Sequence, residues 1–321
     1  MVTASRRRKV LWTILILVGL AALAAIALQI AIARNGPAVL DTVDRLAGGS
    51  RATHSSQPVR FGSEAPAQKL VVHRPHALPD NARLPVVVFF HGGSWDSGDP
   101  EDYAFVGRNL VPSGMIVVTA GYRLGERGAF TAMLEDGADA VAWVRGNIVE
   151  WGGNPDAIML MGHSAGAYNA AMLALDPQWL AGAGVPRETI RAVVGLAGPY
   201  DFYPFDSAST KAAFGAANDP EATQPVNVAR RDAPPFLLIH GTQDTTVRQR
   251  NSQALQRVLR ANGTPAELQL HPEMDHTAPL LHLAHPWRTG GLGGEGGALH
   301  EAIVQFLAKH EPSVPVQSER R

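Results

Sequence analysis

The residues Gly162-His163-Ser164-Ala165-Gly166 place a serine between two glycines at the spacing G-x-S-x-G. This spacing is typical of a sharp turn from a strand into a helix, which exposes the serine hydroxyl for attack on a carbonyl carbon. Glycine is needed on both sides because a Cβ there would collide with neighbouring backbone. Ordinary turns also match so short a pattern, so the flanking residues must decide between a nucleophile and a plain turn.

The residues on either side of Ser164 supply the context that this motif requires. Residues 157–161 form a short apolar run, as expected for a strand buried on both faces. From Ala165 onward the chain is rich in alanine and leucine, which favours a helix that packs closely on a sheet. The order strand, tight turn, helix therefore favours Ser164 as a nucleophile.

A serine nucleophile needs a general base, an acid that orients the base, and donors for the oxyanion. Asp244 follows the apolar run 236–239, and His276 follows the run 267–270 through a short loop. If both runs are strands of one parallel sheet, both side chains lie at its carboxyl edge, as Ser164 does. The order serine, aspartate, histidine is the one expected for a triad on such a sheet. We therefore predict Ser164 as nucleophile, Asp244 as orienting acid and His276 as general base.

Two adjacent glycines, Gly92 and Gly93, follow the β-branched and aromatic run 86–90. Glycines leave their backbone N–H groups unobstructed, and a loop after a central strand lies at the edge where the triad is expected. A plain glycine turn is the alternative. The position of the loop upstream of Ser164 favours an oxyanion-binding loop.

Three other residues compete for these roles. Asp201 is a second acid at the end of a predicted strand, and we interpret it as structural. Asp275 is adjacent to His276 in sequence, and adjacent side chains seldom point at one another. His163, beside the nucleophile, is interpreted as support for the turn and not as the base.

Two patterns suggest a cofactor or a metal, and we reject both. Residues 291–296 match G-x-G-x-x-G, but no strand precedes them, so a flexible loop is predicted instead of a dinucleotide site. Four histidines, His271, His276, His282 and His285, lie close together in sequence without the H-E-x-x-H pattern. We therefore expect neither a metal nor a cofactor.

The rest of the chain alternates between strand patterns and helix patterns. The predicted strands cover residues 59–61, 68–73, 86–90, 115–119, 157–161, 192–196, 236–239 and 267–270. The predicted helices cover residues 102–110, 131–147, 248–261 and 298–310, with another from Ala165 onward. Such alternation over roughly 250 residues predicts an α/β fold with a mostly parallel central sheet and helices on both faces.

The composition fits one large domain and excludes some kinds of chemistry. The chain has 321 residues, of which 45% are hydrophobic and 18% charged, as in an ordinary globular protein. A net charge of −1 gives no sign of a nucleic-acid partner. Because the sequence contains no cysteine, disulfides, thiolate ligands and a catalytic thiol are excluded.

The N-terminal segment differs in character from the rest. Basic residues at 6–9 precede 23 uncharged residues, 11–33. As a helix this run would span about 34 Å at ~1.5 Å per residue, enough for a hydrocarbon core of ~30 Å. Since basic residues stay on the cytoplasmic side, we expect a membrane anchor with the remaining chain on the periplasmic or extracellular side. The alternative is a cleaved signal peptide and a secreted protein, because residues 31–33 resemble a cleavage site.

The chain from about residue 58 to residue 310 resembles the α/β-hydrolases. Within them it is similar to carboxylesterases with an H-G-G oxyanion motif, the hormone-sensitive-lipase-like and isoprenylcysteine-methylesterase-like groups. The matching motifs are HGGSW at 91–95, GYR at 121–123, GGNPDAIMLMGHSAGA at 152–167, HGTQDTTV at 240–247 and MDH at 274–276.

The resemblance implies the roles already given to Ser164, Asp244 and His276. It also implies an oxyanion hole made of backbone N–H groups, those of Gly92, Gly93 and Ala165. Two positions depart from the family pattern. Ser94 stands where many relatives have a third glycine, and Gly121 stands where the family often shows an aspartate followed by a nearby proline.

The sequence thus divides into five predicted segments. Residues 1–10 form a basic cytoplasmic segment, 11–33 the transmembrane anchor or signal peptide, and 34–57 a linker. Residues 58–310 form the α/β-hydrolase domain, and 311–321 a flexible tail.

The resemblance implies a serine hydrolase that cleaves carboxylic esters through an acyl-enzyme intermediate, with a small-molecule ester as partner. Residues 199–232 are too few for a large lid, which favours small to medium acyl groups. One alternative is an amide or formamide hydrolase that uses the same triad. Another is a non-catalytic binding module with the hydrolase fold. The sequence favours no particular oligomeric state.

Overall fold

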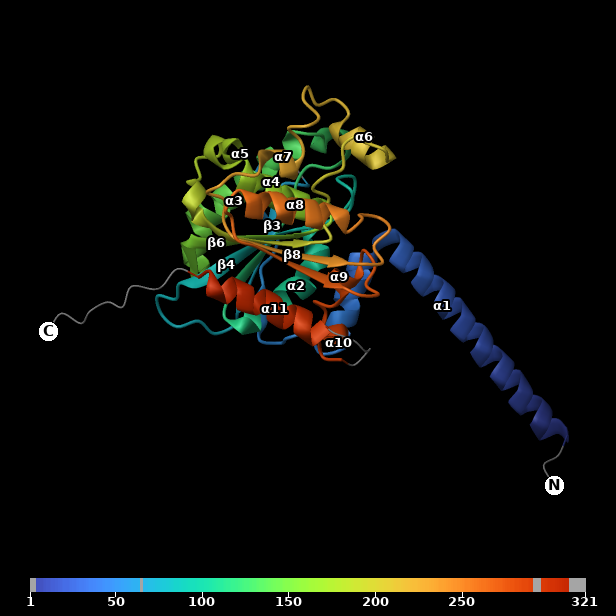
Figure 1. The fold of residues 1–321 in the computed structure, drawn as a ribbon. Helices are drawn as coiled ribbons and strands as arrows, with labels where there is room; N and C mark the ends of the chain where they lie inside the picture. The colour runs from blue at the N-terminus through green and yellow to red at the C-terminus, as the bar shows by residue number, and fades with distance from the viewer. Residues whose placement is uncertain (1–3, 64–65, 291–295, 312–321) are drawn as a thin grey trace.

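One sheet runs through the described part of the chain, which comprises residues 4–63, 66–290 and 296–311 of this computed structural model (Figure 1). Among these residues the strands lie in the order β1-β3-β5-β4-β6-β7-β8-β9, and β2 pairs with β3 outside this path. The strands are β1 (Thr53–Ser55), β2 (Val59–Arg60), β3 (Lys69–Pro75), β4 (Leu84–Phe90), β5 (Ile116–Ala120), β6 (Gly153–His163), β7 (Ile190–Leu196), β8 (Phe236–Gly241) and β9 (Ala266–His271).

The strands β4 to β9 pair in parallel, whereas β3 runs antiparallel to β5, and β1 and β2 run antiparallel to β3. Residues 86–90 of β4 are fully buried. A parallel strand that is covered on both faces needs apolar side chains in both directions, which explains this continuous apolar run. The predicted α/β fold with a mostly parallel central sheet is confirmed.

Helices cover both faces of the sheet. In Figure 1, α3, α4 and α8 lie on one face, and α2 and α11 lie on the other. Side chains of β4 alternate between the two resulting cores, with Val86 and Val88 in the first and Val87 and Phe89 in the second. The α-helices are α1 (Ala4–Leu46), α2 (Ala104–Leu110), α3 (Ala132–Asn147), α4 (Ala165–Leu175), α5 (Pro177–Gly182), α6 (Ala208–Phe214), α7 (Pro225–Val228), α8 (Arg250–Ala261), α9 (Ala278–Leu281), α10 (His285–Arg288) and α11 (Gly296–Lys309).

Every stretch that the sequence predicts as a strand or a helix forms one, with ends that shift by a few residues. The elements that the sequence did not predict are short. They are β1, which has three residues, and the helices α5, α6, α7, α9 and α10, which have four to seven residues each. Such short helices do not repeat an apolar position often enough to show a helical period.

The predicted linker, residues 34–57, begins as a helix. The helix α1 continues to Leu46 after a kink at Asn35, where φ is −155° and ψ is 80°. Beyond the kink, Asp41 and Asp44 bind Arg108 of α2 at 2.6 and 2.7 Å. Asp41 and Asp44 of this segment therefore hold it against the domain.

Parts of three predicted segments lie outside the described residues. These parts are residues 1–3 of the basic segment, residues 291–295 of the glycine-rich loop and residues 312–321 of the tail. The division of the chain into segments stays a prediction.

Candidate active site

Ser164 stands at a sharp turn between β6 and α4. Its backbone has a φ of 53° and a ψ of −121°, a conformation that residues other than glycine rarely adopt. Its N–H donates to the carbonyl oxygen of Leu196 on the neighbouring β7 at 2.8 Å. A Cβ at Gly162 would lie 2.3 Å from the backbone of Gly166, and one at Gly166 would lie 2.0 Å from the carbonyl oxygen of Phe90. Both glycines are thus required by the close approach of strand and helix.

The structure brings the three predicted triad residues together at the carboxyl edge of the sheet. Asp244 follows β8 and His276 follows β9. The distance from His276 Nε2 to Ser164 Oγ is 2.9 Å, and that from His276 Nδ1 to Asp244 Oδ2 is 2.7 Å. Ser164 and Asp244 are 8% and 5% exposed, so both side chains are largely shielded from solvent. The Ser164 hydroxyl still lines a cavity.

The surroundings of Asp244 keep its carboxylate ionised. Its Oδ1 accepts hydrogen bonds from the N–H groups of Thr246 and Val247 at 2.9 and 2.8 Å. Burial pushes the pKa of Asp244 upward, but hydrogen bonds from His240 and His276 outweigh it and hold the pKa below its usual value. Because the carboxylate only accepts, His276 Nδ1 carries the proton. Its Nε2 is then free to accept a proton from Ser164.

A second histidine, His240, supports the same carboxylate. Its Nε2 lies 2.7 Å from the carbonyl oxygen of Val247 and 3.2 Å from Asp244 Oδ2. Its Nδ1 lies 2.7 Å from Ser252 Oγ of α8. Since a carbonyl only accepts, Nε2 is the donor and the Ser252 hydroxyl donates to Nδ1. Sequence analysis missed this residue, although it stands four positions before Asp244 in the HGTQD motif.

His163 supports the base from the other side. Its Nε2 donates to the carbonyl oxygen of His276 at 2.9 Å, and the two rings lie 5.0 Å apart. Burial, helped by the charge of His276, lowers the pKa of His163 to about 3. A neutral ring that donates to a carbonyl agrees with the interpretation of His163 as support for the turn.

The loop after β4 passes close to Ser164. A Cβ at Gly92 would lie 3.0 Å from His163 Nδ1 and 3.3 Å from Ser164 Cβ. Gly93 has a φ of 115°, and a Cβ there would lie 2.0 Å from the carbonyl oxygen of Ser97. Ala165 is the first residue of α4, so its N–H makes no bond within the helix. The three predicted oxyanion donors therefore belong to segments that adjoin the nucleophile.

The two departures from the family pattern have local explanations. Ser94, in place of a third glycine, has a φ of 57°, so a serine takes up the left-handed backbone here. A Cβ at Gly121 would lie 2.4 Å from the carbonyl oxygen of Ala67, which excludes an aspartate. The arginine of the GYR motif, Arg123, pairs with the buried Asp136 and helps to fix this loop.

The competing acids are turned to other partners. Asp275 Oδ1 accepts from the N–H groups of Thr277 and Ala278, both at 2.9 Å. Asp201 is exposed, and its N–H donates to Asn251 at 2.8 Å. Within the described ranges, no three His, Asp or Glu side chains are grouped so as to hold a metal ion.

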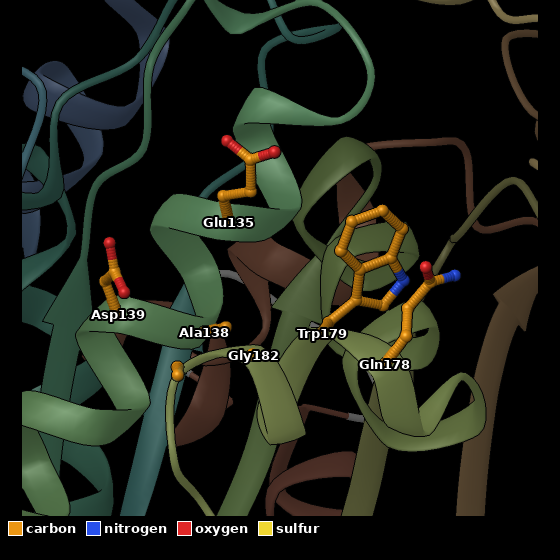
Figure 2. Close-up of a pocket in the computed structure, with 7 residues that line it drawn as sticks. Glu135, Ala138, Asp139, Gln178, Trp179 and Gly182 are labelled. Carbon is orange, nitrogen blue, oxygen red and sulfur yellow. The ribbon is translucent and has the colours of Figure 1, made fainter.

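A cavity of about 440 Å³ opens at Ser164. Its lining includes the aromatic side chains of Trp95, Phe202 and Tyr203, several hydroxyl groups and two arginines, Arg248 and Arg250. A second hollow of about 270 Å³ lies between α3 and α5 and contains no triad residue (Figure 2). Only the first hollow reaches the serine hydroxyl.

This sheet, with a G-x-S-x-G turn between β6 and α4, is that of an α/β-hydrolase. A family model described as BD-FAE matches residues 76–259, and the chain belongs to this family. The resemblance to α/β-hydrolase carboxylesterases drawn from the motifs is thereby confirmed.

Curated relatives cover a similar part of the chain. Esterase LipQ of Mycobacterium tuberculosis (strain ATCC 25618 / H37Rv) is 30% identical over 230 residues, 66% of this chain and 54% of its own. The isoprenylcysteine alpha-carbonyl methylesterase ICME of Arabidopsis thaliana is 31% identical over 236 residues, 66% of this chain and 55% of its own. The chain thus spans little more than half the length of these relatives.

Solved structures agree with the fold. An inhibited esterase B from Lactobacillus rhamnosis has a TM-score of 0.70 at 22% identity, covering 90% of this chain and 96% of its own. A truncated carbohydrate esterase from gut microbiota has a TM-score of 0.68 at 19% identity, covering 80% and 96%. At these identities the likeness concerns the fold alone.

Proposed function

We propose that this chain is a serine hydrolase that cleaves carboxylic esters through an acyl-enzyme intermediate. The observation that carries the proposal is the continuous hydrogen-bond chain from Ser164 through His276 to Asp244, at 2.9 and 2.7 Å. Membership of the BD-FAE family and relatives named as esterases support an ester as the substrate.

In the first half of the reaction Ser164 Oγ attacks the carbonyl carbon of the ester. His276 Nε2 takes the hydroxyl proton as the new C–O bond forms, and Asp244 stabilises the resulting imidazolium. The imidazolium then gives its proton to the alcohol oxygen as the bond between that oxygen and the carbonyl carbon breaks. In the second half a water molecule, activated by His276, attacks the acyl group and frees Ser164.

The backbone N–H groups of Gly92, Gly93 and Ala165 are the proposed donors to the tetrahedral oxyanion. They belong to rigid segments beside Ser164, so little reorganisation is needed as the negative charge forms. A donor of this kind is worth about 3 kcal/mol of transition-state stabilisation.

The cavity supports small to medium acyl groups. Its volume of about 440 Å³ lies at the low end of what small-molecule sites offer. The chain between β7 and β8 adds only the short helices α6 and α7 above the site. The aromatic wall formed by Trp95 and Phe202 suits the apolar part of such an ester.

We further propose that α1 anchors the protein in a membrane, with the catalytic domain on the non-cytoplasmic side. From residue 8 onward α1 is long and apolar enough to cross a membrane, and its apolar part packs against none of the described residues of the domain (Figure 1). The basic residues 6–9 precede this run, which favours a cytoplasmic N-terminus. A cleaved signal sequence would also pass the test of length and composition.

Replacing the nucleophile tests the enzyme proposal. Ser164→Ala should lower turnover of p-nitrophenyl esters by a factor on the order of 10⁶, because triad members act as a unit. An organophosphonate should label Ser164 in the unmodified protein and abolish turnover. Rates on acetyl to octanoyl esters and on a matched anilide give the substrate class.

Any other result of these experiments would favour a different function. Unchanged ester turnover by Ser164→Ala would exclude the proposed nucleophile. A faster rate on the anilide would favour an amide hydrolase. Absence of any turnover and of labelling in the unmodified protein would favour a binding module.

A further inference from the structure

The apolar part of α1 meets the catalytic domain without a spacer. Residues 8–30 are exposed along their whole length, and the uncharged run ends at Ala33. From residue 36 to residue 41 every residue is at least partly buried. Only Arg34 and Asn35 lie between, and two helical residues advance the chain by roughly 3 Å.

Asn35 joins the two parts of α1 to the domain. Its Oδ1 accepts from the N–H of Ala38 at 3.1 Å, which caps the part beyond the kink. Its Nδ2 donates to Asp102 Oδ2 at 2.7 Å. One amide therefore starts the second part of the helix and fixes the point at which the first part leaves the domain.

A buried carboxylate makes this joint rigid. Asp44 is fully buried and accepts from Arg108 Nε at 2.7 Å, from Asn109 Nδ2 at 2.8 Å and from the N–H of His285 at 2.7 Å. A buried charge is tolerated only when it is paired and hydrogen-bonded in this way. The helix beyond Asn35 thus cannot swing without leaving Asp44 unsatisfied.

The segments that α1 contacts are continuations of the catalytic loops. Asp102 belongs to the turn Pro100–Tyr103, which directly follows the loop of Gly92 and Gly93. His285 begins α10, which follows His276 after the short α9. In Figure 1, α1 leaves the domain on the side to which the strand arrows beside the label β8 point. The anchor and the catalytic residues therefore share the carboxyl edge of the sheet.

We infer that this edge is held at the surface of the membrane and that the site acts on amphiphilic esters presented by that membrane. The inference rests on the proposed function and on α1 as an anchor. The layer of head groups extends about 5 to 7 Å beyond each side of the hydrocarbon core. The contact of Asn35 with Asp102 follows the apolar run by less than this thickness, so the turn Pro100–Tyr103, which follows the loop of Gly92 and Gly93 in the chain, lies at the level of the head groups.

A flexible insertion distinguishes the effect of holding the site at the membrane surface from an effect on ester hydrolysis itself. The full chain is reconstituted in phosphatidylcholine vesicles that contain hexadecyl acetate, and acetate release is compared with hydrolysis of water-soluble p-nitrophenyl acetate. About sixteen Gly and Ser residues inserted between Arg34 and Asn35 span roughly 20 to 24 Å and uncouple the domain from the anchor. The rate on hexadecyl acetate should fall about tenfold relative to the rate on p-nitrophenyl acetate, because the local concentration of the site at the surface drops.

A matched control carries the same insertion between Ser5 and Arg6, which leaves the joint at Asn35 intact and should keep the unmodified ratio. If the insertion after Arg34 impairs folding, Asn35→Ala, which removes both the contact with Asp102 and the cap on the helix beyond the kink, should lower the same ratio to a smaller extent. An unchanged ratio in a folded variant, or a mature chain that begins near Arg34, overturns the inference. Failure of the unmodified chain to hydrolyse p-nitrophenyl acetate would instead refute the proposed function.

Discussion

Asp244 shares its carboxylate between two imidazole rings, and this arrangement sets the tautomer of the base. His276 and His240 approach the same oxygen at 2.7 and 3.2 Å. His240 is fixed in turn by Val247 and Ser252, so Asp244 cannot rotate away from His276. The carboxylate of Asp244 is thus held with its Oδ2 toward His276 Nδ1.

Asp244→Asn should leave the fold intact and lower turnover by a factor on the order of 10⁴. An amide is neutral and can present its NH₂ group to His276, which favours the wrong tautomer and does not stabilise the imidazolium. Asp275→Asn is the matched control because Asp275 binds groups of its own turn, the N–H groups of Thr277 and Ala278 and the Thr277 hydroxyl. Rates on p-nitrophenyl acetate and circular dichroism of both variants provide the test. A larger loss in Asp275→Asn would reassign the acid.

The proximity of Ser164, Asp244 and His276 could be predicted because each residue follows an apolar run in a recognisable motif. His240 and the contact of His163 could not be predicted in the same way. The partner of His163 is a carbonyl group 113 positions along the chain, and that of His240 Nδ1 lies in a different element. Such pairs arise from tertiary packing, and no local pattern encodes them.

At the scale of elements, the turn between β6 and α4 depends on the absence of a side chain at Gly166. Gly166 lies in the first turn of α4, where it touches the carbonyl oxygens of Phe90 and His91 at the end of β4. The helix can approach the sheet this closely only because no side chain intervenes. Gly146, near the end of α3, has nothing within 4 Å of the position that a Cβ would take.

Alanine at these two positions should therefore have opposite effects. Gly166→Ala should lower the free energy of unfolding and turnover together, because its Cβ would lie 2.0 Å from a backbone oxygen. Gly146→Ala should raise the free energy of unfolding by about 0.5 to 1 kcal/mol, since alanine is the better helix former, and should leave turnover unchanged. Urea unfolding and ester turnover measure both. Equal effects of the two substitutions would contradict this account of the turn.

The long strands and helices could be predicted from their apolar runs, as for β4 and α3. The segment 34–57 shows where this reasoning fails. From the sequence alone, Asp41 and Asp44 resemble solvent-exposed residues of a linker. In the structure they bind Arg108, which lies 64 to 67 positions later. The charge of a residue indicates that it needs a partner, and it does not indicate whether that partner is water or protein.

At the scale of the whole molecule, three buried histidines set the response to acid. Burial lowers the pKa of His73 and of His163 to about 3 and that of His91 to about 4. In the unfolded chain each has a pKa of about 6.5. Below that value the unfolded chain binds more protons than the folded one, so the free energy of unfolding falls as the pH is lowered from about 6.5 towards 4.

The slope should reach about 4 kcal/mol per pH unit if all three rings stay neutral in the fold, since each contributes about 1.4. Urea unfolding of the full chain in detergent at pH 7, 6 and 5 measures it. His73→Gln should reduce the slope by about a third, because it removes one of the three rings, and within the described residues the His73 ring bonds Ser55 and Thr119. Unfolding free energies that do not change between pH 6.5 and pH 5 would show that the rings are charged in the fold.

The order of the triad along the chain has a consequence for synthesis. Ser164 and His276 are 112 positions apart, and His276 lies beyond β9, the edge strand that pairs only with β8. In the proposed triad, a chain that is still emerging from the ribosome or a translocation pore carries the nucleophile and its acid but no base. Its serine is then an ordinary alcohol, inert toward the esters of the compartment in which it is made. On the proposed mechanism, reactivity begins only when β9 joins the sheet and His276 reaches Ser164.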